Sequence, residues 1–168
     1  MWNVIPEQIY NRIWTILDTD PDLSYFKTKQ RGFFPRGGQV SQDQFPWLFM
    51  EDLGMSGIEG YRMPMNWQSD FTIAVVLMTY ADAGDIESIV VGGGDNVNKG
   101  ILQMQGDVAN VLWKHHKGGI GVNGVIKWTI ARSGTPSLLN IQRLLMSDFI
   151  RGRQIDIAFN ISEVESIS

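Results

Sequence analysis

WQSDFTIAVVLMTYA, residues 67–81, is the strongest strand pattern in the chain. Successive side chains of a strand point to opposite faces of the sheet, so each set of alternate positions reports on one face. The odd positions are mostly apolar and predict a face that is buried throughout: Trp67, Phe71, Ile73, Val75 and Leu77. The even positions begin polar and become apolar: Gln68, Asp70 and Thr72, then Ala74, Val76, Met78 and Tyr80. The second face is therefore expected to be covered only toward the C-terminal end of the strand.

The length of this strand also carries information. Its 15 residues, at about 3.4 Å each, span roughly 50 Å. A compact domain of 168 residues has a diameter of roughly 40 Å. An unbroken strand is therefore expected to project past the core and to need a partner there, whereas a bend or a bulge would remove this expectation.

The elements on either side follow from periodicity. Before the strand, we predict a helix over 5–18, an irregular stretch over 31–46, a short strand over Trp47–Glu51 and a glycine-containing loop through Gly54, Gly57 and Gly60. After it, we predict a helix over about 97–116, with an apolar stripe at Ile101, Met104, Val108, Val111 or Leu112, and His115. Strands are then predicted over 125–132 and 154–163, the last with Ile155, Ile157, Phe159 and Ile161 facing inward, whereas 133–145 is ambiguous.

This order of elements predicts an α+β fold, with an antiparallel or mixed β-sheet and two main helices packed on one face. The length fits a single domain over 1–168. The segment 82–96 is longer than a simple connection and is interpreted as a loop insertion.

The composition excludes several classes of protein. The chain has no cysteine, which removes disulfides, thiolate nucleophiles, cysteine-ligated zinc and iron–sulfur clusters without fixing the compartment. A net charge of −4 argues against a protein that neutralises many nucleic-acid phosphates. One modest basic run, Lys27, Lys29, Arg31 and Arg36, is interpreted as a solvated loop.

The N-terminal residues lack the basic start and apolar core of a signal peptide. No apolar stretch approaches the roughly 20 residues of a membrane helix. We therefore expect a protein that makes no membrane contact and stays in the cytoplasm of the cell that makes it until it is released.

The candidate motifs for chemistry are incomplete. Gly92-Gly93-Gly94 before a helix suggests a dinucleotide-binding turn, but the third glycine of that fingerprint falls at Val97. The run Asp18-Thr19-Asp20-Pro21-Asp22 begins like a calcium loop, yet Leu23 and Lys29 stand where the glycine and the bidentate glutamate belong. These aspartates are instead expected to end one helix and to form the next turn.

His115 and His116 are the only histidines, and neighbouring helix residues point about 100° apart, so the two do not grip one metal together. No nucleophile elbow occurs. We therefore predict no catalytic residue, no metal site and no cofactor.

The layout of the whole chain resembles the tail terminator (tail completion) proteins of long-tailed bacteriophages. The resemblance rests on the first helix, the short and long strands, the second helix and the closing stretch Asp148-Phe149-Ile150-Arg151-Gly152-Arg153 that leads into Gln154–Phe159. It implies a virion structural protein, not an enzyme, that closes into a homohexameric ring on the tail tube. The implied partners are copies of itself, the tail tube protein and the head–tail connector protein, with DNA only as passing cargo.

A ring needs head-to-tail contacts between different surfaces of one subunit, and such contacts use apolar and aromatic side chains outside the main core. The candidates for this subunit interface lie in or beside glycine- and proline-rich loops: Phe33, Phe34, Trp47, Tyr61, Met63 and Met65. The alternative for each is that it folds back onto its own domain.

Three other functions remain open from the sequence. The same layout permits a head–tail connector or neck protein, either a stopper or an adaptor. An enzyme for a nucleotide or another small ligand would use the glycine loop at 92–94. A monomeric binding module of a host cell is the third.

Overall fold

The computed structural model describes residues 4–32, 41–59, 66–80, 99–116, 119–123, 125–138, 141–142 and 150–164. The sheet, the helices and three short 3-10 turns follow in this order: α1 (Val4–Thr19), η1 (Pro21–Leu23), β1 (Thr28–Arg31), η2 (Gln42–Gln44), β2 (Trp47–Glu59), β3 (Asn66–Tyr80), α3 (Ile101–Lys114), η3 (Gly119–Gly121), β4 (Val125–Gly134) and β5 (Ile150–Val164).

The five strands form one mixed sheet in the order β1-β2-β3-β5-β4. Strand β1 is parallel to β2, whereas the other neighbours are antiparallel. The centre of the sheet is the β3–β5 ladder, which pairs all 15 residues from Asn66 with Val164 to Tyr80 with Ile150. The predicted long strand is confirmed within one residue at each end, and it is continuous.

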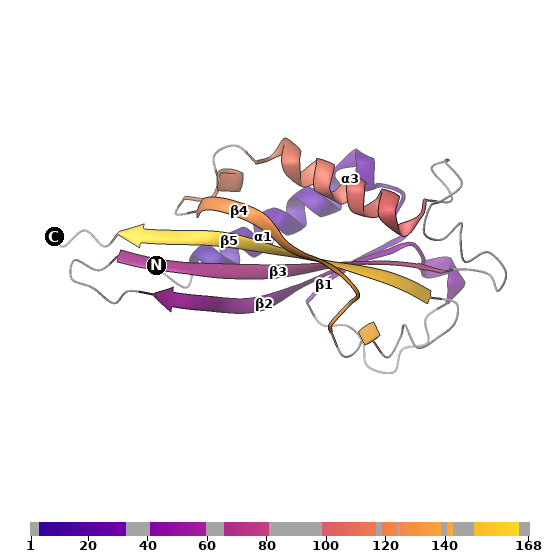
Figure 1. Ribbon diagram of the computed structural model, residues 1–168. Coiled ribbons are helices and arrows are strands. Elements are labelled where there is room, and N and C mark those ends of the chain that lie inside the picture. Colours follow the sequence, from indigo (N-terminus) through magenta and orange to yellow (C-terminus); the bar gives the residue numbers. More distant parts are fainter. Residues whose placement is uncertain are drawn as a thin grey trace.

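Both helices cover the same face of this sheet (Figure 1). Alternate residues of β3 and β5 point toward them and are almost fully buried, as the period-2 pattern predicted. The helices contribute residues three and four apart, so that one apolar stripe of each faces the sheet. The core contains, among others, Ile9, Ile13 and Leu17 of α1, Met104, Val108 and Leu112 of α3, Phe71, Ile73, Val75 and Leu77 of β3, and Ile155, Ile157, Phe159 and Ile161 of β5. The predicted α+β fold with two helices on one face is confirmed.

The opposite face of the sheet is divided into two halves. Toward the C-terminal end of β3, Val76 and Met78 are buried in a second cluster with Phe45, Trp47, Phe49, Ile141 and Ile150. Toward the other end this face is polar, and Asn160 donates to Asp70 at 3.0 Å. The expectation that this face becomes covered only along the later part of the strand is confirmed.

The loop predicted after Glu51 is wrong, because β2 continues to Glu59. Its pairing with β3 shifts between Asp52 and Gly54 and again between Ser56 and Glu59. Gly54 has φ +85°, a backbone conformation that glycine adopts without the steric cost of a Cβ. Gly54 and Gly57 therefore lie at β-bulges within a strand, not at the end of one, whereas Gly60 lies outside the described residues.

The basic run was also interpreted wrongly where the structure describes it, since Thr28–Arg31 is the edge strand β1. The Lys29 ammonium donates to the carbonyl oxygens of Leu17 and Asp18 at 3.0 and 2.8 Å, and so caps the C-terminal end of α1. Arg31 donates to Asn11 and lies over the rings of Tyr10 and Trp14. The run thus holds the first helix to the edge of the sheet.

Three boundaries differ from prediction for local reasons. Helix α3 begins at Ile101 instead of about Val97, because Gly100 is extended and serves as its N-cap. Strand β4 runs on to Gly134, and β5 begins at Ile150, four residues before the predicted start. The predicted insertion at 82–96 lies outside the described residues.

Two glycine-to-alanine substitutions are expected to have opposite effects on stability. At Gly54 the positive φ strains any L side chain, so Gly54→Ala should lower the free energy of unfolding by about 1–2 kcal/mol. At Gly106, inside α3, a Cβ would meet nothing within 4 Å. Gly106→Ala should therefore raise the free energy of unfolding by about 1 kcal/mol. Urea unfolding of the two variants is the measurement, and shifts of the same sign would contradict the bulge geometry.

Candidate functional site

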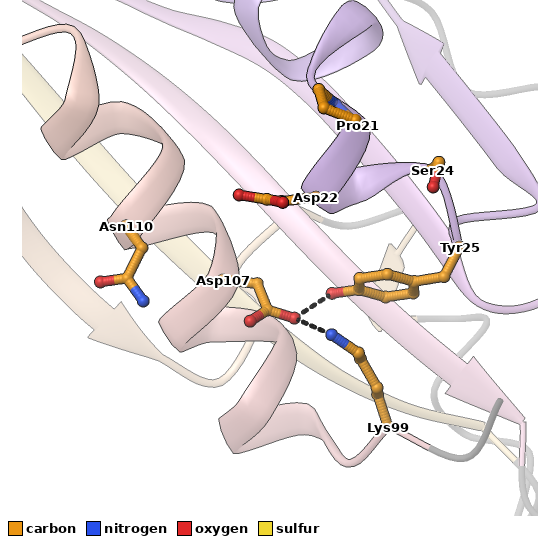
Figure 2. Close-up of a pocket in the computed structure, with 7 residues that line it drawn as sticks. All are labelled: Pro21, Asp22, Ser24, Tyr25, Lys99, Asp107 and Asn110. Carbon is orange, nitrogen blue, oxygen red and sulfur yellow. Dashed lines mark hydrogen bonds and ion pairs between the residues drawn. The ribbon is translucent and has the colours of Figure 1, made fainter. Parts of the chain in front are cut away.

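A polar pocket of about 310 Å³ lies between the turn after α1 and the helix α3. Figure 2 shows the seven residues that line it: Pro21, Asp22, Ser24, Tyr25, Lys99, Asp107 and Asn110. Two segments about 80 residues apart in sequence therefore form one pocket, which makes it the first candidate for a ligand-binding or catalytic site.

The turn that carries Tyr25 is set by its own sequence. The Asp20 side chain accepts from the Asp22 backbone N–H at 2.9 Å and caps the 3-10 turn, with Pro21 at its first position. Leu23 is fully buried in the main core and anchors the turn. Tyr25 stacks on Phe26 with their ring centroids 4.6 Å apart, which aims its hydroxyl at α3.

The carboxylate of Asp107 is the centre of the pocket. Its Oδ2 accepts from the Tyr25 hydroxyl at 3.0 Å and from the Lys99 ammonium at 2.6 Å. The Lys99 nitrogen also lies 4.3 Å from the centroid of the Tyr25 ring, a cation–π contact. Figure 2 shows both side chains converging on this one oxygen.

The Asp107 carboxylate is the hydrogen-bond partner of the Tyr25 hydroxyl and the ion-pair partner of the Lys99 ammonium. Burial, and next the negative charge of Asp107, raise the pKa of Tyr25 well above its usual range, so the phenol stays protonated at neutral pH. A tyrosine base or nucleophile needs the opposite shift. The Lys99 side chain is only 12% exposed and its charge is balanced by Asp107. We call this set of contacts the Tyr25–Asp107–Lys99 bracket, because it joins the turn after α1 to α3. Its tyrosine is not activated as a base or nucleophile.

A second bracket lies beside the first. The Lys114 ammonium is 3.8 Å from Asp20 Oδ1 and also pairs with Asp22. The Asp18–Asp22 run therefore ends α1, caps a turn and holds the end of α3, so its prediction as a helix stop and turn is confirmed. Within the described part of the chain, no three His, Asp or Glu side chains lie close enough to hold a metal ion.

The two histidines lie at the end of α3. His115 is the C-cap residue of the helix. The His116 ring stacks on Trp113, with centroids 4.4 Å apart and an angle of 7° between the planes, and its Nδ1 lies 2.6 Å from the Trp113 carbonyl oxygen. These contacts terminate the helix.

Most of the predicted interface residues lie outside the described residues: Phe33, Phe34, Tyr61, Met63 and Met65, together with the glycine loop at 92–94. Trp47 is described, and it is 5% exposed within its own chain. Its ring packs edge-on against Phe45, with centroids 6.0 Å apart, in the second cluster. Trp47 therefore packs onto its own domain, which was the alternative to an interface role, and it leaves little surface for a neighbouring subunit.

The sheet itself offers another interaction surface. Strand β1 pairs only with Trp47–Met50 of β2. Among the described residues, nothing pairs with that side of β2 from Glu51 to Glu59. We call this stretch the β2 edge, and the outer side of Val125–Gly134 the β4 edge. Beyond the helices, β2, β3 and β5 continue together toward the C-terminal end of β5 (Figure 1). Such edges carry unpaired N–H and C=O groups and are sites where another chain adds a strand.

Large apolar side chains on the described surface were not among the predicted interface residues. They are Leu53 at 42% exposed, Leu102 at 50%, Trp113 at 63% and Ile130 at 44%. Leu102 and Trp113 were detectable, because both lie off the apolar stripe of α3. Leu53 and Ile130 were not, because each lies beside a shift in strand register that periodicity does not show.

A scan of the sequence against protein-family models finds no match, and a search among curated proteins finds none. Neither α-helix in the described part of the chain combines the length and the apolar character needed to cross a membrane.

The bracket at Tyr25 predicts a pH dependence of stability. Because its pKa is raised in the folded state, the stabilising contribution is complete below the ordinary tyrosine value of about 10 and is lost as the pH rises above it. At pH 7, Tyr25→Phe should lower the free energy of unfolding by about 1 kcal/mol, the worth of one hydrogen bond. The difference between wild type and variant should shrink between pH 9 and about 11.5. Urea unfolding across this range is the measurement; a constant difference would show that the phenol is not held protonated by the fold.

Proposed function

We propose that this chain is a structural protein of a bacteriophage virion, a tail terminator that acts by assembling with copies of itself. Six copies would close into a ring that caps the tail tube and joins it to the head connector. The number of copies and the two partners come from the resemblance in layout, whereas self-assembly is also supported by the sheet.

The observation that carries the proposal is the unbroken β3–β5 ladder of 15 residue pairs, in a sheet whose β2 and β4 edges have no partner strand among the described residues. An isolated domain normally shortens, covers or closes such edges, because they template pairing with other chains. Here, within the described residues, the β2 edge is uncovered over nine residues, Glu51–Glu59. A structural protein that binds its own copies has a use for these edges.

Charge is compatible with a passage for DNA. A net charge of −4 disfavours persistent adhesion to phosphates, so DNA would be cargo that passes through the ring. A head–tail connector or neck protein, either a stopper or an adaptor, is a close variant of this proposal, since it would use the same edges in a ring at a neighbouring position of the virion.

The polar pocket does not favour an enzyme over an assembly component. Its lysine, tyrosine and aspartate are engaged with one another, and the tyrosine is held in its protonated state. A substrate would have to displace the bracket that fixes the turn to α3.

The purified chain is expected to form a closed oligomer, with a six-fold species in native mass spectrometry or addition to isolated tail tubes. Phe33→Asp with Phe34→Asp should give folded subunits that fail to close, because charge at an apolar contact costs desolvation energy. Gln8→Glu with Asn123→Asp, which adds the same charge at exposed positions, is the control and should still assemble. A chain that stays monomeric at high concentration contradicts the proposal.

The nucleotide alternative has its own test. Replacing Gly92, Gly93 and Gly94 with alanine should leave any nucleotide affinity unchanged, as measured by calorimetry. Binding in the wild type that disappears in this variant would favour the enzyme.

A further inference from the structure

Two edges of the sheet have no partner strand among the described residues, and they carry charges of opposite sign. The β2 edge, EDLGMSGIE, contains Glu51, Asp52 and Glu59 and no basic residue. The β4 edge, VIKWTIARSG, contains Lys127 and Arg132 and no acidic residue. Burial, and next the charge of Asp52, raise the pKa of Glu51. One side of the sheet is therefore acidic and the other basic.

The strand register places these charges at matching heights. Glu51 pairs with Ala74, Ala74 with Asp156, and Asp156 with Arg132, so a single row across the sheet begins with an acid and ends with a base. The Arg132 guanidinium lies 3.7 Å from Asp156 and donates to the Thr135 carbonyl oxygen at 2.8 Å, while 44% of its side chain is exposed. The exposed part is accessible to a carboxylate of a second copy.

The adjacent row begins with an acid and ends with an apolar side chain. Asp52 pairs with Ile73, Ile73 with Ile157, and Ile157 with Ile130. Leu53 follows Asp52 at the bulge of β2. Leu53 and Ile130 are 42% and 44% exposed, and each lies on one of the two open edges. Both edges therefore present an apolar contact next to a charge.

We propose that the sheet of one subunit is continued by the next, with the β4 edge of one copy adding head to tail to the β2 edge of its neighbour. The inference rests on the self-assembly part of the proposed function and names the surfaces that meet. Strand directions alternate from β2 through β3 and β5 to β4, so the new pair is antiparallel. At equal height it brings Arg132 beside Glu51 of the neighbour, and Ile130 beside Asp52 and Leu53.

The charges select this pairing over the symmetric ones. Two β2 edges placed together would repel through their acids, and two β4 edges through their bases. Only the unlike edges attract, and a contact between unlike surfaces produces rings or filaments instead of closed dimers. Exposed ion pairs add little affinity, so main-chain hydrogen bonds and the burial of Leu53 and Ile130 supply it, while charge sets the partner.

The absence of cysteine from the sequence allows a direct test by disulfide formation. Within one chain, β3 and β5 separate the two edges by three strand spacings, about 14 Å in total. A disulfide requires Cα atoms closer than about 7 Å. A bond between Leu53→Cys and Ile130→Cys is therefore necessarily intermolecular, and an antiparallel strand pair provides the required spacing.

Oxidised Leu53→Cys/Ile130→Cys protein should run as a ladder of oligomers on a non-reducing gel. A mixture of the two single variants should give mainly the mixed dimer, whereas each alone should stay monomeric. The matched control is Leu53→Cys/Leu102→Cys, whose second site is 50% exposed but lies on α3; it should give no ladder.

Native mass spectrometry of the wild type distinguishes failure of the proposed edge pairing from failure of the proposed self-assembly. An oligomer without the 53–130 crosslink, or with equal crosslinking in the control, overturns the edge pairing and leaves the ring function standing. A monomer without a crosslink overturns both.

Exchanging the charges of Glu51 and Arg132 tests the pairing directly, because recovery of assembly in the double variant is not expected if the two residues only stabilise their own subunit. Glu51→Lys alone and Arg132→Glu alone should each weaken assembly by about tenfold or more, because like charges then meet. The double variant Glu51→Lys/Arg132→Glu restores unlike charges across the junction and should recover assembly, while circular dichroism confirms the fold of all three. A double variant that assembles no better than the single variants would overturn the proposed pairing.

Discussion

Strands β3 and β5 pair residue for residue over 15 positions, and this ladder determines the direction of the side chains around it. Because the side-chain period of a strand is two, one register places Phe71, Ile73, Val75 and Leu77 toward the helices together with their partners on β5. A slip of one residue would turn this set to the opposite face. The packing of α1 and α3, and the second cluster on the other face, depend on this register.

The ladder also makes the molecule longer than its helical layer. The helices cover one face over part of its length, and Phe45, Leu138 and Ile141 pack on the other face toward the C-terminal end of β3. Within the described residues, unpaired backbone N–H and C=O groups lie at the sheet edges, because β1 pairs with only four residues of β2. Interactions between α3 and the turn after α1 are internally satisfied around Asp107. The polar pocket therefore contributes to the fold.

The sequence predicted the elements whose apolar pattern repeats cleanly and failed where the pattern is absent. The helix α1, the strand β3 and the inward face of β5 follow from periods of 3.6 and 2. Strand β1 was missed, because Thr28–Arg31 has no apolar residue and is stabilised by contacts with α1. The extension of β2 was missed because Gly54 was interpreted as a loop, although it marks a bulge. Of the predicted interface residues, Trp47 is packed within its own chain, and the others lie outside the described residues.

The sequence by itself determined the α+β class, the central strand with its two unlike faces, and the composition without cysteine. Only the tertiary structure decided that β2 continues to Glu59 and that β2 and β4 provide opposite edges of one sheet, with Glu51 and Arg132 at the ends of the same row. The reason is physical: periodicity reports which face of a segment is buried, whereas the strand order and register depend on long-range pairing, such as that of Asn66 with Val164, 98 residues apart in sequence.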